Sequence, residues 1–304
     1  LWYRQPADRW EAALPLGNGR LGAMVYGYAD NERLRLNEES LWAGEPVDAY
    51  SDDFTENLRK VQQLVLEGKI AEARALGLKT LTKRPTSFRS YEPLGDLRIE
   101  TEHAAAVEDY RRSLDLKTGL AVVTYRAGGI GYRREAFISA ADDVLVVRIS
   151  VDKPGALNCR VGLARQKDAE ITAVEHHLAL DGQIVDLPPP QGKEDNPGGS
   201  GPPGPHMRFA ARLRAQSDQG TIEPAGDKLA IDGASGVVLL LTAATDYSLA
   251  KMDFDRSIDP AARAAQILAA ATKKPFDELR DDHLAEHRAM FSRVALDLGG
   301  PARD

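Results

Sequence analysis

The residue types best suited to chemistry lie in one short segment, Leu36–Gly44, which has the sequence LNEESLWAG. Two carboxylates, Glu38 and Glu39, are adjacent, and Trp42 follows shortly after them. General acid–base catalysis needs groups that flank a substrate, whereas neighbouring side chains on a strand point to opposite faces. The indole of Trp42 could offer a flat face to a sugar ring. Two interpretations stay open for this segment: contact with a ligand, or packing within the fold.

A glycine-rich motif near the start of the chain, Gly17–Gly22, matches the pattern G-x-G-x-x-G of dinucleotide-binding proteins. That function requires a strand before the glycines and a helix after them, because the helix amides hold the pyrophosphate. Here Pro15 precedes the motif, and the strand-like run Ala23–Tyr26 follows it. The sequence therefore predicts a glycine turn that enters a strand, and no nucleotide site.

Two histidines, His283 and His287, are four residues apart on a predicted helix and would share one face, where they could hold a metal. Their order, His-Leu-Ala-Glu-His, moves the glutamate away from its position in metalloproteases, and no third ligand is evident. This favours surface or interface histidines. No nucleophile elbow, phosphate-binding loop or Ser-His-Asp spacing is evident either. These residues alone predict no active site, no metal site and no cofactor.

Composition limits the class of protein. The 304 residues contain 39 Lys and Arg against 46 Asp and Glu, a net charge of −7 that disfavours nucleic acid and anionic membranes as partners. The single cysteine, Cys159, excludes an internal disulfide and a Cys-based zinc site. The longest apolar run, Val237–Leu241, is only strand length, so no membrane span is expected. No signal peptide is visible, and the first residue, Leu1, suggests that a segment was removed upstream.

The elements that must position these residues are mostly strands. Between Arg112 and Val151, short alternating runs separated by turn residues predict an antiparallel sandwich. Over about 54–81, the spacing of the apolar residues changes from that of a strand to that of a helix. This predicts two short inserted helices, the first capped by Ser51 or Asp52.

The second half of the chain contains a Pro/Gly-rich stretch and then a change of character. Residues 188–205 hold seven of the 17 prolines and five glycines, and predict a long mobile loop inside the β domain. Asp259 and Pro260 predict a helix start before the Ala-rich Ala261–Thr272. A last helix is expected from Pro275 to about Val294, with these residues on its apolar side: Phe276, Leu279, Met290, Phe291 and Val294. The expected division is a β domain over 1–250 and a helical linker over 251–304.

Several segments, in order along nearly the whole chain, are similar to one known family. They are Trp10–Ala12, Leu14–Met24, Leu36–Gly44, Tyr91–Leu97, Tyr110–Leu116, Tyr132–Ser139 and the connector His283–Leu298. Together they resemble the N-terminal domain of glycoside hydrolase family 95, the α-L-fucosidase and α-L-galactosidase type. That domain is related in fold to the N-terminal domain of glycoside hydrolase family 65.

The resemblance implies a mainly β fold: a large antiparallel β super-sandwich with a short inserted helical segment and a C-terminal helical linker. In the family an (α/α)6 barrel follows and carries an inverting mechanism, with a glutamate acid and a carboxylate-assisted asparagine base placed apart to admit a water. The barrel motifs have no counterpart here, so no catalytic residue is assigned, and this chain alone is expected to be inactive.

The resemblance also implies partners. The domain is expected to pack on its own barrel and help to shape the cleft, where the candidate residues are Asn37, Glu38, Glu39 and Trp42. The parent enzyme would act on α-L-fucosyl or α-L-galactosyl glycans and is expected to be exported to the periplasm or the medium. Two alternatives stay open: a stand-alone carbohydrate-binding β-sandwich module, or the N-terminal domain of a family 65-type disaccharide phosphorylase.

Overall fold

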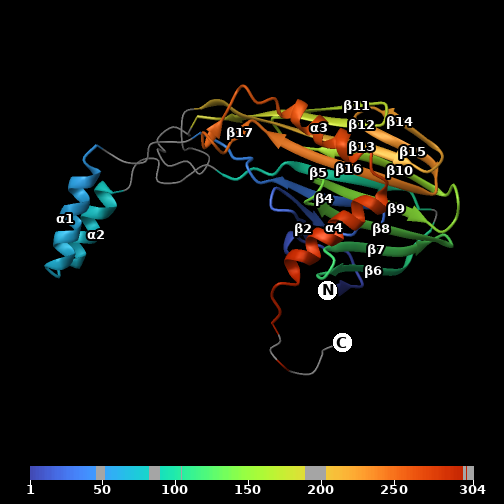
Figure 1. The fold of residues 1–304 in the computed structure, drawn as a ribbon, viewed down its shortest axis with the longest axis horizontal. Helices are drawn as coiled ribbons and strands as arrows, with labels where there is room; N and C mark the ends of the chain where they lie inside the picture. Colours follow the sequence, from blue (N-terminus) through green and yellow to red (C-terminus); the bar gives the residue numbers. More distant parts are fainter. Residues whose placement is uncertain (46–51, 82–89, 104, 189–202, 297–298, 300–304) are drawn as a thin grey trace.

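The structure is a computed structural model that describes residues 1–45, 52–81, 90–103, 105–188, 203–296 and 299. Within these residues, two large antiparallel sheets face each other (Figure 1). The larger sheet has nine strands, in the spatial order β1 (Trp2–Tyr3), β6 (Val107–Asp115), β7 (Leu120–Ala127), β8 (Ile130–Ser139), β9 (Val144–Val151), β16 (Gly236–Thr245), β13 (Gly204–Ser217), β12 (His177–Asp186) and β11 (Ala169–Val174). The predicted antiparallel sandwich is confirmed.

The smaller sheet has seven strands among the described residues. Their order is β14 (Thr221–Ala225), β15 (Lys228–Ala234), β10 (Leu157–Ala164), β5 (Gly95–Thr101), β4 (Asn31–Glu38), β3 (Leu21–Val25) and β2 (Leu14–Gly17). A short pair, β17 (Tyr247–Ser248) and β18 (Asp253–Phe254), follows β16, and a 3-10 turn, η1 (Trp10–Ala12), precedes β2.

The main core lies between the sheets, because each strand alternates between an apolar face directed inward and a more polar face. On β4, for example, Leu34 and Leu36 are buried whereas Arg33 and Arg35 are partly exposed. Strands β9 and β16 are apolar on both faces, which is typical of strands that are covered on both sides. Two C-terminal helices supply the second cover.

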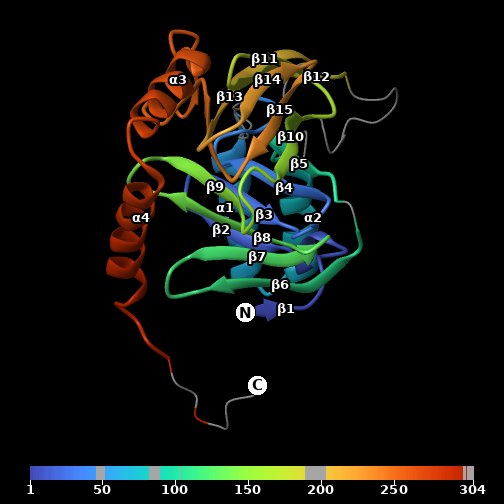
Figure 2. The same ribbon diagram turned by 90° about the vertical axis from the view of Figure 1, so that its right-hand side faces the viewer.

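These helices, α3 (Pro260–Ala271) and α4 (Phe276–Phe291), lie on the outer face of the larger sheet (Figure 2). A second apolar cluster fills the interface, with Phe137, Val146 and Leu240 from the sheet against Leu268 and Leu279 from the helices. The predicted start of α3 is confirmed: a carboxylate oxygen of Asp259 accepts hydrogen bonds from the next two free amides at 2.9 and 3.1 Å. The two predicted C-terminal helices are therefore present.

The predicted apolar side of the last helix is only partly right. Helix α4 ends at Phe291 rather than near Val294, and the residues that pack on the sheet come from its first half: Phe276, Leu279 and His283. Met290, Phe291 and Val294 are instead exposed. The reason is that α4 contacts β8 with its first turns, so that its last turn reaches past the apolar cluster.

The two helix histidines dock α4 onto a turn of the larger sheet. His283 Nε2 donates to the carbonyl of Thr118 at 2.9 Å, and His287 Nε2 donates to that of Leu116 at 3.0 Å. The imidazole of His283 also stacks on Phe137, with ring centroids 4.7 Å apart. These are interface histidines, as the sequence favours, and both Nε2 atoms are engaged by carbonyls.

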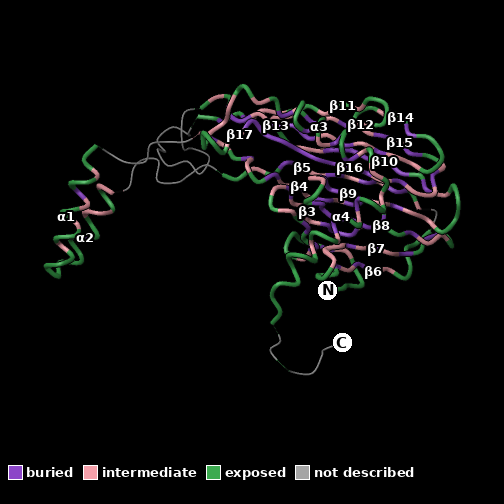
Figure 3. The backbone as a smooth tube through the Cα atoms, viewed as in Figure 1, coloured by how far each residue is buried: buried purple, intermediate pink, exposed green. Residues whose placement is uncertain are grey.

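The predicted inserted helices are present as α1 (Phe54–Leu66) and α2 (Ile70–Thr80), which pack against each other. Figure 1 shows the pair apart from the sandwich, and Figure 3 shows that most of its surface is exposed. The N-cap position of α1 is Asp53, so the predicted caps Ser51 and Asp52 are wrong. In the described part of the chain, no helix is long and apolar enough to cross a bilayer.

The Pro/Gly-rich stretch predicted as a loop over 188–205 lies mostly outside the described residues. Its last residues, Gly204 and Pro205, already belong to β13, where they pair with Asp186 and Val185 of β12. The stretch therefore joins two neighbouring strands of the same sheet.

Candidate functional site

The glycine motif forms a turn between β2 and β3, as predicted, and Asn18 shapes it. Asn18 Oδ1 accepts hydrogen bonds from the amides of Arg20 (3.0 Å) and Leu21 (2.7 Å), and Gly19 adopts a positive φ of 95°. Asn18 Nδ2 donates across to the larger sheet, to Ser139 O at 3.2 Å and Asp143 Oδ1 at 3.1 Å. The turn thus joins the two sheets and directs Arg20 between them.

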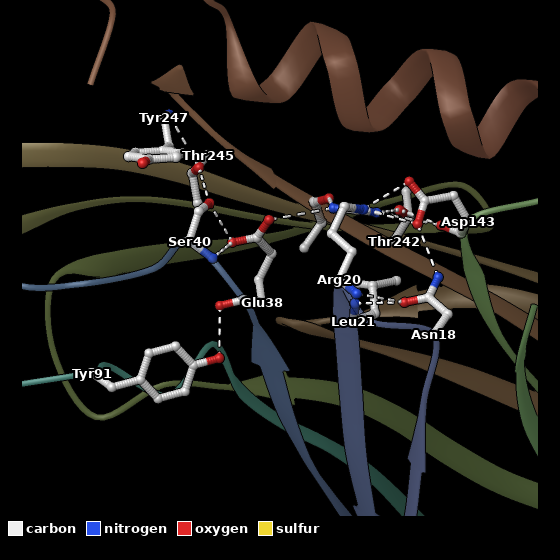
Figure 4. Close-up of polar contacts among 11 residues, drawn as sticks. Asn18, Arg20, Leu21, Glu38, Ser40, Tyr91, Asp143, Thr242, Thr245 and Tyr247 are labelled. Atoms are coloured by element: carbon white, nitrogen blue, oxygen red, sulfur yellow. Dashed lines mark hydrogen bonds and ion pairs between the residues drawn. The ribbon is translucent and has the colours of Figure 1, made fainter. Parts of the chain in front are cut away.

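Arg20 is held by three groups of the larger sheet (Figure 4). Its Nε donates to both carboxylate oxygens of Asp143, at 2.8 and 2.7 Å. Its Nη2 donates to Thr242 Oγ1 at 3.0 Å, and its Nη1 donates to the carbonyl of Ala243. Because the guanidinium is planar and held at several points, its orientation is well determined.

Glu38, the last residue of β4, faces the same region and is only 4% exposed. Its Oε2 accepts hydrogen bonds from the amide (2.9 Å) and the hydroxyl (2.7 Å) of Ser40, which in turn lies 2.6 Å from Thr245 Oγ1. Its Oε1 lies 3.5 Å from Arg20 Nη1. Burial raises the pKa of Glu38 above its ordinary value, while the Ser40 hydrogen bonds and the charge of Arg20 oppose that rise.

The segment after β4 is held by the chain that runs antiparallel beside it. The amide of Glu92 donates to Leu41 O and that of Ala43 donates to Ser90 O, both at 3.0 Å. The hydroxyl of Tyr91 donates to the carbonyl oxygen of Glu38 at 2.8 Å. The ring of Tyr91 packs edge-on against that of Trp42, with ring centroids 5.1 Å apart. Trp42 is therefore fixed in place although it remains 47% exposed.

These side chains line a pocket of about 660 Å³ at one end of the sandwich. Its walls come from the Leu36–Gly44 segment, the end of β16, the β17–β18 pair and α3: Arg20, Glu38, Glu39, Ser40, Trp42, Ala43, Gly44, Glu45, Met207, Thr245, Tyr247, Leu249, Met252, Asp253, Phe254 and Arg263. A volume of this size is typical of small-molecule sites, which are concave and mostly apolar with a few oriented polar groups.

Three of the four candidate residues from the sequence, Glu38, Glu39 and Trp42, come together in this pocket. The fourth, Asn37, does not line it. Asn37 lies on the other face of β4, opposite Gly22 of β3, and its side chain hydrogen-bonds to Tyr91. The alternation of side chains along a strand explains the separation of Asn37 from Glu38.

Sequence reasoning did not identify several residues of the pocket, including Thr245, Tyr247, Phe254 and Arg263. They come from elements some 200 residues further along the chain, and the hydroxyls of Ser40 and Thr245 are separated by 205 positions. Arg20 is the exception, since it lies in the glycine motif that the sequence analysis singles out. No local pattern marks the others.

Carboxylates of Glu38, Glu39, Glu45 and Asp253 line the pocket together with only two guanidinium groups. One oxygen of Glu38 is saturated by Ser40, and Glu39 is exposed beyond the end of the strand. In the described residues, no three His, Cys, Asp or Glu side chains are grouped so that they could hold a metal.

Comparison with known proteins identifies the class. Residues 1–250 match the family described as glycosyl hydrolase family 65, N-terminal domain, and the chain belongs to that family. It is 31% identical to α-L-fucosidase 2 of Arabidopsis thaliana, over 99% of this chain and 36% of that protein. It is 27% identical to the probable α-fucosidase A of Aspergillus niger, over 99% of this chain and 38% of that protein. The resemblance to the α-fucosidase type is confirmed.

The chain spans less than two fifths of the length of these two relatives. Among solved structures, a putative kojibiose phosphorylase from the human microbiome is similar with a TM-score of 0.48 and 10% identity, over 91% of this chain and 35% of that one.

Proposed function

We propose that this chain is the non-catalytic N-terminal domain of an α-L-fucosidase-type hydrolase that acts on α-L-fucosyl or α-L-galactosyl glycans, and that it forms one wall of the substrate cleft. The observation that carries the proposal is the pocket that the Leu36–Gly44 segment forms with Thr245 and Tyr247. Its relatives named as fucosidases are more than twice as long as the matched region, which supports a further domain in the parent protein.

The catalytic groups would lie on that further domain. Glu38 cannot move freely, because Ser40 holds one of its oxygens and the strand end holds its backbone. The inverting mechanism that the resemblance implies needs an acid and a base placed far enough apart to admit a water beside the sugar, and both would lie on that further domain. The pocket supplies instead a fixed wall with an indole and a carboxylate, which would orient a glycan.

The exposed end of α4 supports the proposal that this domain packs against the barrel of the parent protein. Leu116 and Phe291 are exposed apolar residues in one area, because His287 contacts both the Leu116 carbonyl and the ring of Phe291. Exposed apolar groups gathered in this way are typical of surfaces that another domain covers. We propose that the barrel packs here.

The test compares two proteins: the 304-residue chain and the longer product of the same gene. With 2′-fucosyllactose and p-nitrophenyl α-L-fucoside as substrates, only the longer protein should release fucose. In that protein, Trp42→Ala should raise KM about tenfold with little change in kcat, since a wall residue contributes uniform binding. Trp10→Ala, at an exposed tryptophan outside the pocket, is the matched control.

Three results would overturn the proposal. One is robust turnover by a clean preparation of the 304-residue chain. Another is phosphate-dependent cleavage of a disaccharide by the longer protein, which would favour a family 65-type phosphorylase. The third is a gene that encodes no further domain, which would favour a stand-alone carbohydrate-binding module. Export of the parent is part of the same proposal, and a leader sequence upstream in the gene would test it.

A further inference from the structure

At the floor of the pocket, Arg20 and Glu38 face each other without a direct hydrogen bond. Glu38 Oε1 and Arg20 Nη1 lie 3.5 Å apart, whereas a direct bond between a guanidinium and a carboxylate measures about 2.7–2.9 Å. The described residues form no hydrogen bond to this oxygen, although Glu38 Oε2 accepts two. The oxygen itself is accessible from the pocket, so a group that enters the pocket can bond to it. The floor therefore presents one strong acceptor beside one strong donor.

A hydroxyl group fits this arrangement, because it can donate to Glu38 Oε1 and accept from Arg20 Nη1 at the same time. Neither protein group can move to close the gap. Asp143, Thr242 and Ala243 hold the guanidinium, and Ser40 holds the carboxylate. Because these groups are already ordered, a ligand can bind them without the loss of side-chain entropy that ordering would cost.

The walls above this floor are apolar and aromatic. Trp42 and Phe254 present rings, and Met207 closes the pocket on the side of β13. Rings of this kind pack against the C–H face of a sugar, which is apolar although its hydroxyls are not. An alcohol with no ring would fill only part of the roughly 660 Å³ available.

The sign of the charges sets the class of ligand. Four carboxylates and two guanidinium groups line the pocket, so an anionic ligand would meet net repulsion. A cationic ligand at the floor would lie next to the guanidinium of Arg20, which would repel it. We propose that the pocket binds one neutral sugar residue, with a hydroxyl held between Glu38 and Arg20 and its ring against Trp42. This inference rests on the proposed function and names the class of sugar that the domain itself selects.

The test uses the 304-residue chain and four monosaccharides, with calorimetry or tryptophan fluorescence as the readout. L-fucose and D-galactose are neutral, whereas D-galactosamine and D-galacturonate add one charge of each sign. The two neutral sugars should bind saturably, and each charged one should bind at least about tenfold more weakly than galactose. Glu38→Gln keeps the size of the side chain and removes the charged acceptor, so it should weaken binding about tenfold.

Control variants separate the pocket from the rest of the surface. Trp42→Ala should also weaken sugar binding about tenfold, while Trp10→Ala, which removes a tryptophan of similar exposure outside the pocket, should leave it unchanged. No saturable binding of either neutral sugar, equal binding of all four sugars, or full binding by Glu38→Gln would each overturn the inference.

The outcome is independent of the test of the proposed function. If the longer protein hydrolyses fucosides but the 304-residue chain binds no neutral sugar, the inference fails and the proposed function stands. If the chain binds neutral sugars but the longer protein has no hydrolase activity, the inference stands and the proposed function fails.

Discussion

Strand β4 carries two buried glutamates that differ in their surroundings. Glu32 lies near the start of the strand and pairs with Arg134 of β8, deep between the two sheets. Its Oε1 accepts from the amides of Gly27 (2.8 Å) and Arg33 (2.9 Å), and its Oε2 accepts from Arg134. Glu38 lies at the other end of the strand and leaves one oxygen facing the pocket, 3.5 Å from Arg20.

The two ion pairs share their burial but differ in their hydrogen bonds. Burial raises the pKa of both glutamates, so neither desolvation nor the presence of an arginine distinguishes them. What differs is whether the protein satisfies both carboxylate oxygens. At Glu32 it does, and at Glu38 it leaves one for another molecule. Four substitutions test this difference.

Glu32→Ala should have the largest effect on stability. It would leave the guanidinium of Arg134 buried without its carboxylate and should lower the free energy of unfolding by about 3–5 kcal/mol. Urea denaturation measures this. Replacing both partners, Glu32→Leu with Arg134→Leu, should recover part of the loss, because it removes the unpaired charge but leaves the amides of Gly27 and Arg33 without their acceptor. If Glu56→Ala, at an exposed pair on α1, costs as much, the explanation is wrong.

Asp143→Ala should come next. It would remove the acceptor of Arg20 Nε and of Asn18 Nδ2, and should cost about 1–3 kcal/mol. Since Arg20 would then lose part of its support, neutral-sugar binding should weaken as well. Unfolding and sugar titration on the same preparation measure both effects. A loss of stability with unchanged sugar affinity would show that Arg20 is not needed at the floor.

Trp42→Ala should cost only about 1 kcal/mol of stability, because the indole is half exposed and loses chiefly its edge-on contact with Tyr91. Its effect on sugar affinity should be much larger than its effect on stability. Thermal unfolding compared with titration measures the ratio. A destabilisation as large as that of Glu32→Ala would mean that Trp42 is chiefly a packing residue.

Of the four substitutions, Glu38→Gln should change the free energy of unfolding least. It should nevertheless change how that free energy depends on pH. Because folding raises the pKa of Glu38, the folded state binds its proton more readily, and stability falls as pH rises through the raised value. The Gln variant lacks this fall. Its free energy of unfolding relative to the unsubstituted chain should therefore increase as pH rises from about 4, until the folded-state carboxyl of Glu38 has ionised. A pH-independent difference would contradict the raised pKa.

Much of the fold follows from local pattern. The change from strand alternation to helical spacing located α1 and α2, and the Asp259-Pro260 pair located the start of α3. No local pattern singled out β10 and β11, and the apolar residues up to Val294 predicted too late an end for α4. These failures have one cause. The conformation and burial of the apolar residues there are set by the surface on which they pack, and local sequence does not specify that surface.

The sequence by itself determined the antiparallel sandwich, the helical insertion and linker, and the likeness to the fucosidase type, because periodicity and ordered segments are carried by neighbouring residues. Only the tertiary structure decided which residues form the pocket. Packing of one sheet on the other brings the hydroxyl of Thr245 within 2.6 Å of that of Ser40 across 205 positions. Alternation along β4 turns Glu38 inward and Asn37 away. Hydrogen bonds across the sheets, which no local pattern encodes, hold Arg20 so that its Nη1 lies 3.5 Å from the Glu38 oxygen that faces the pocket.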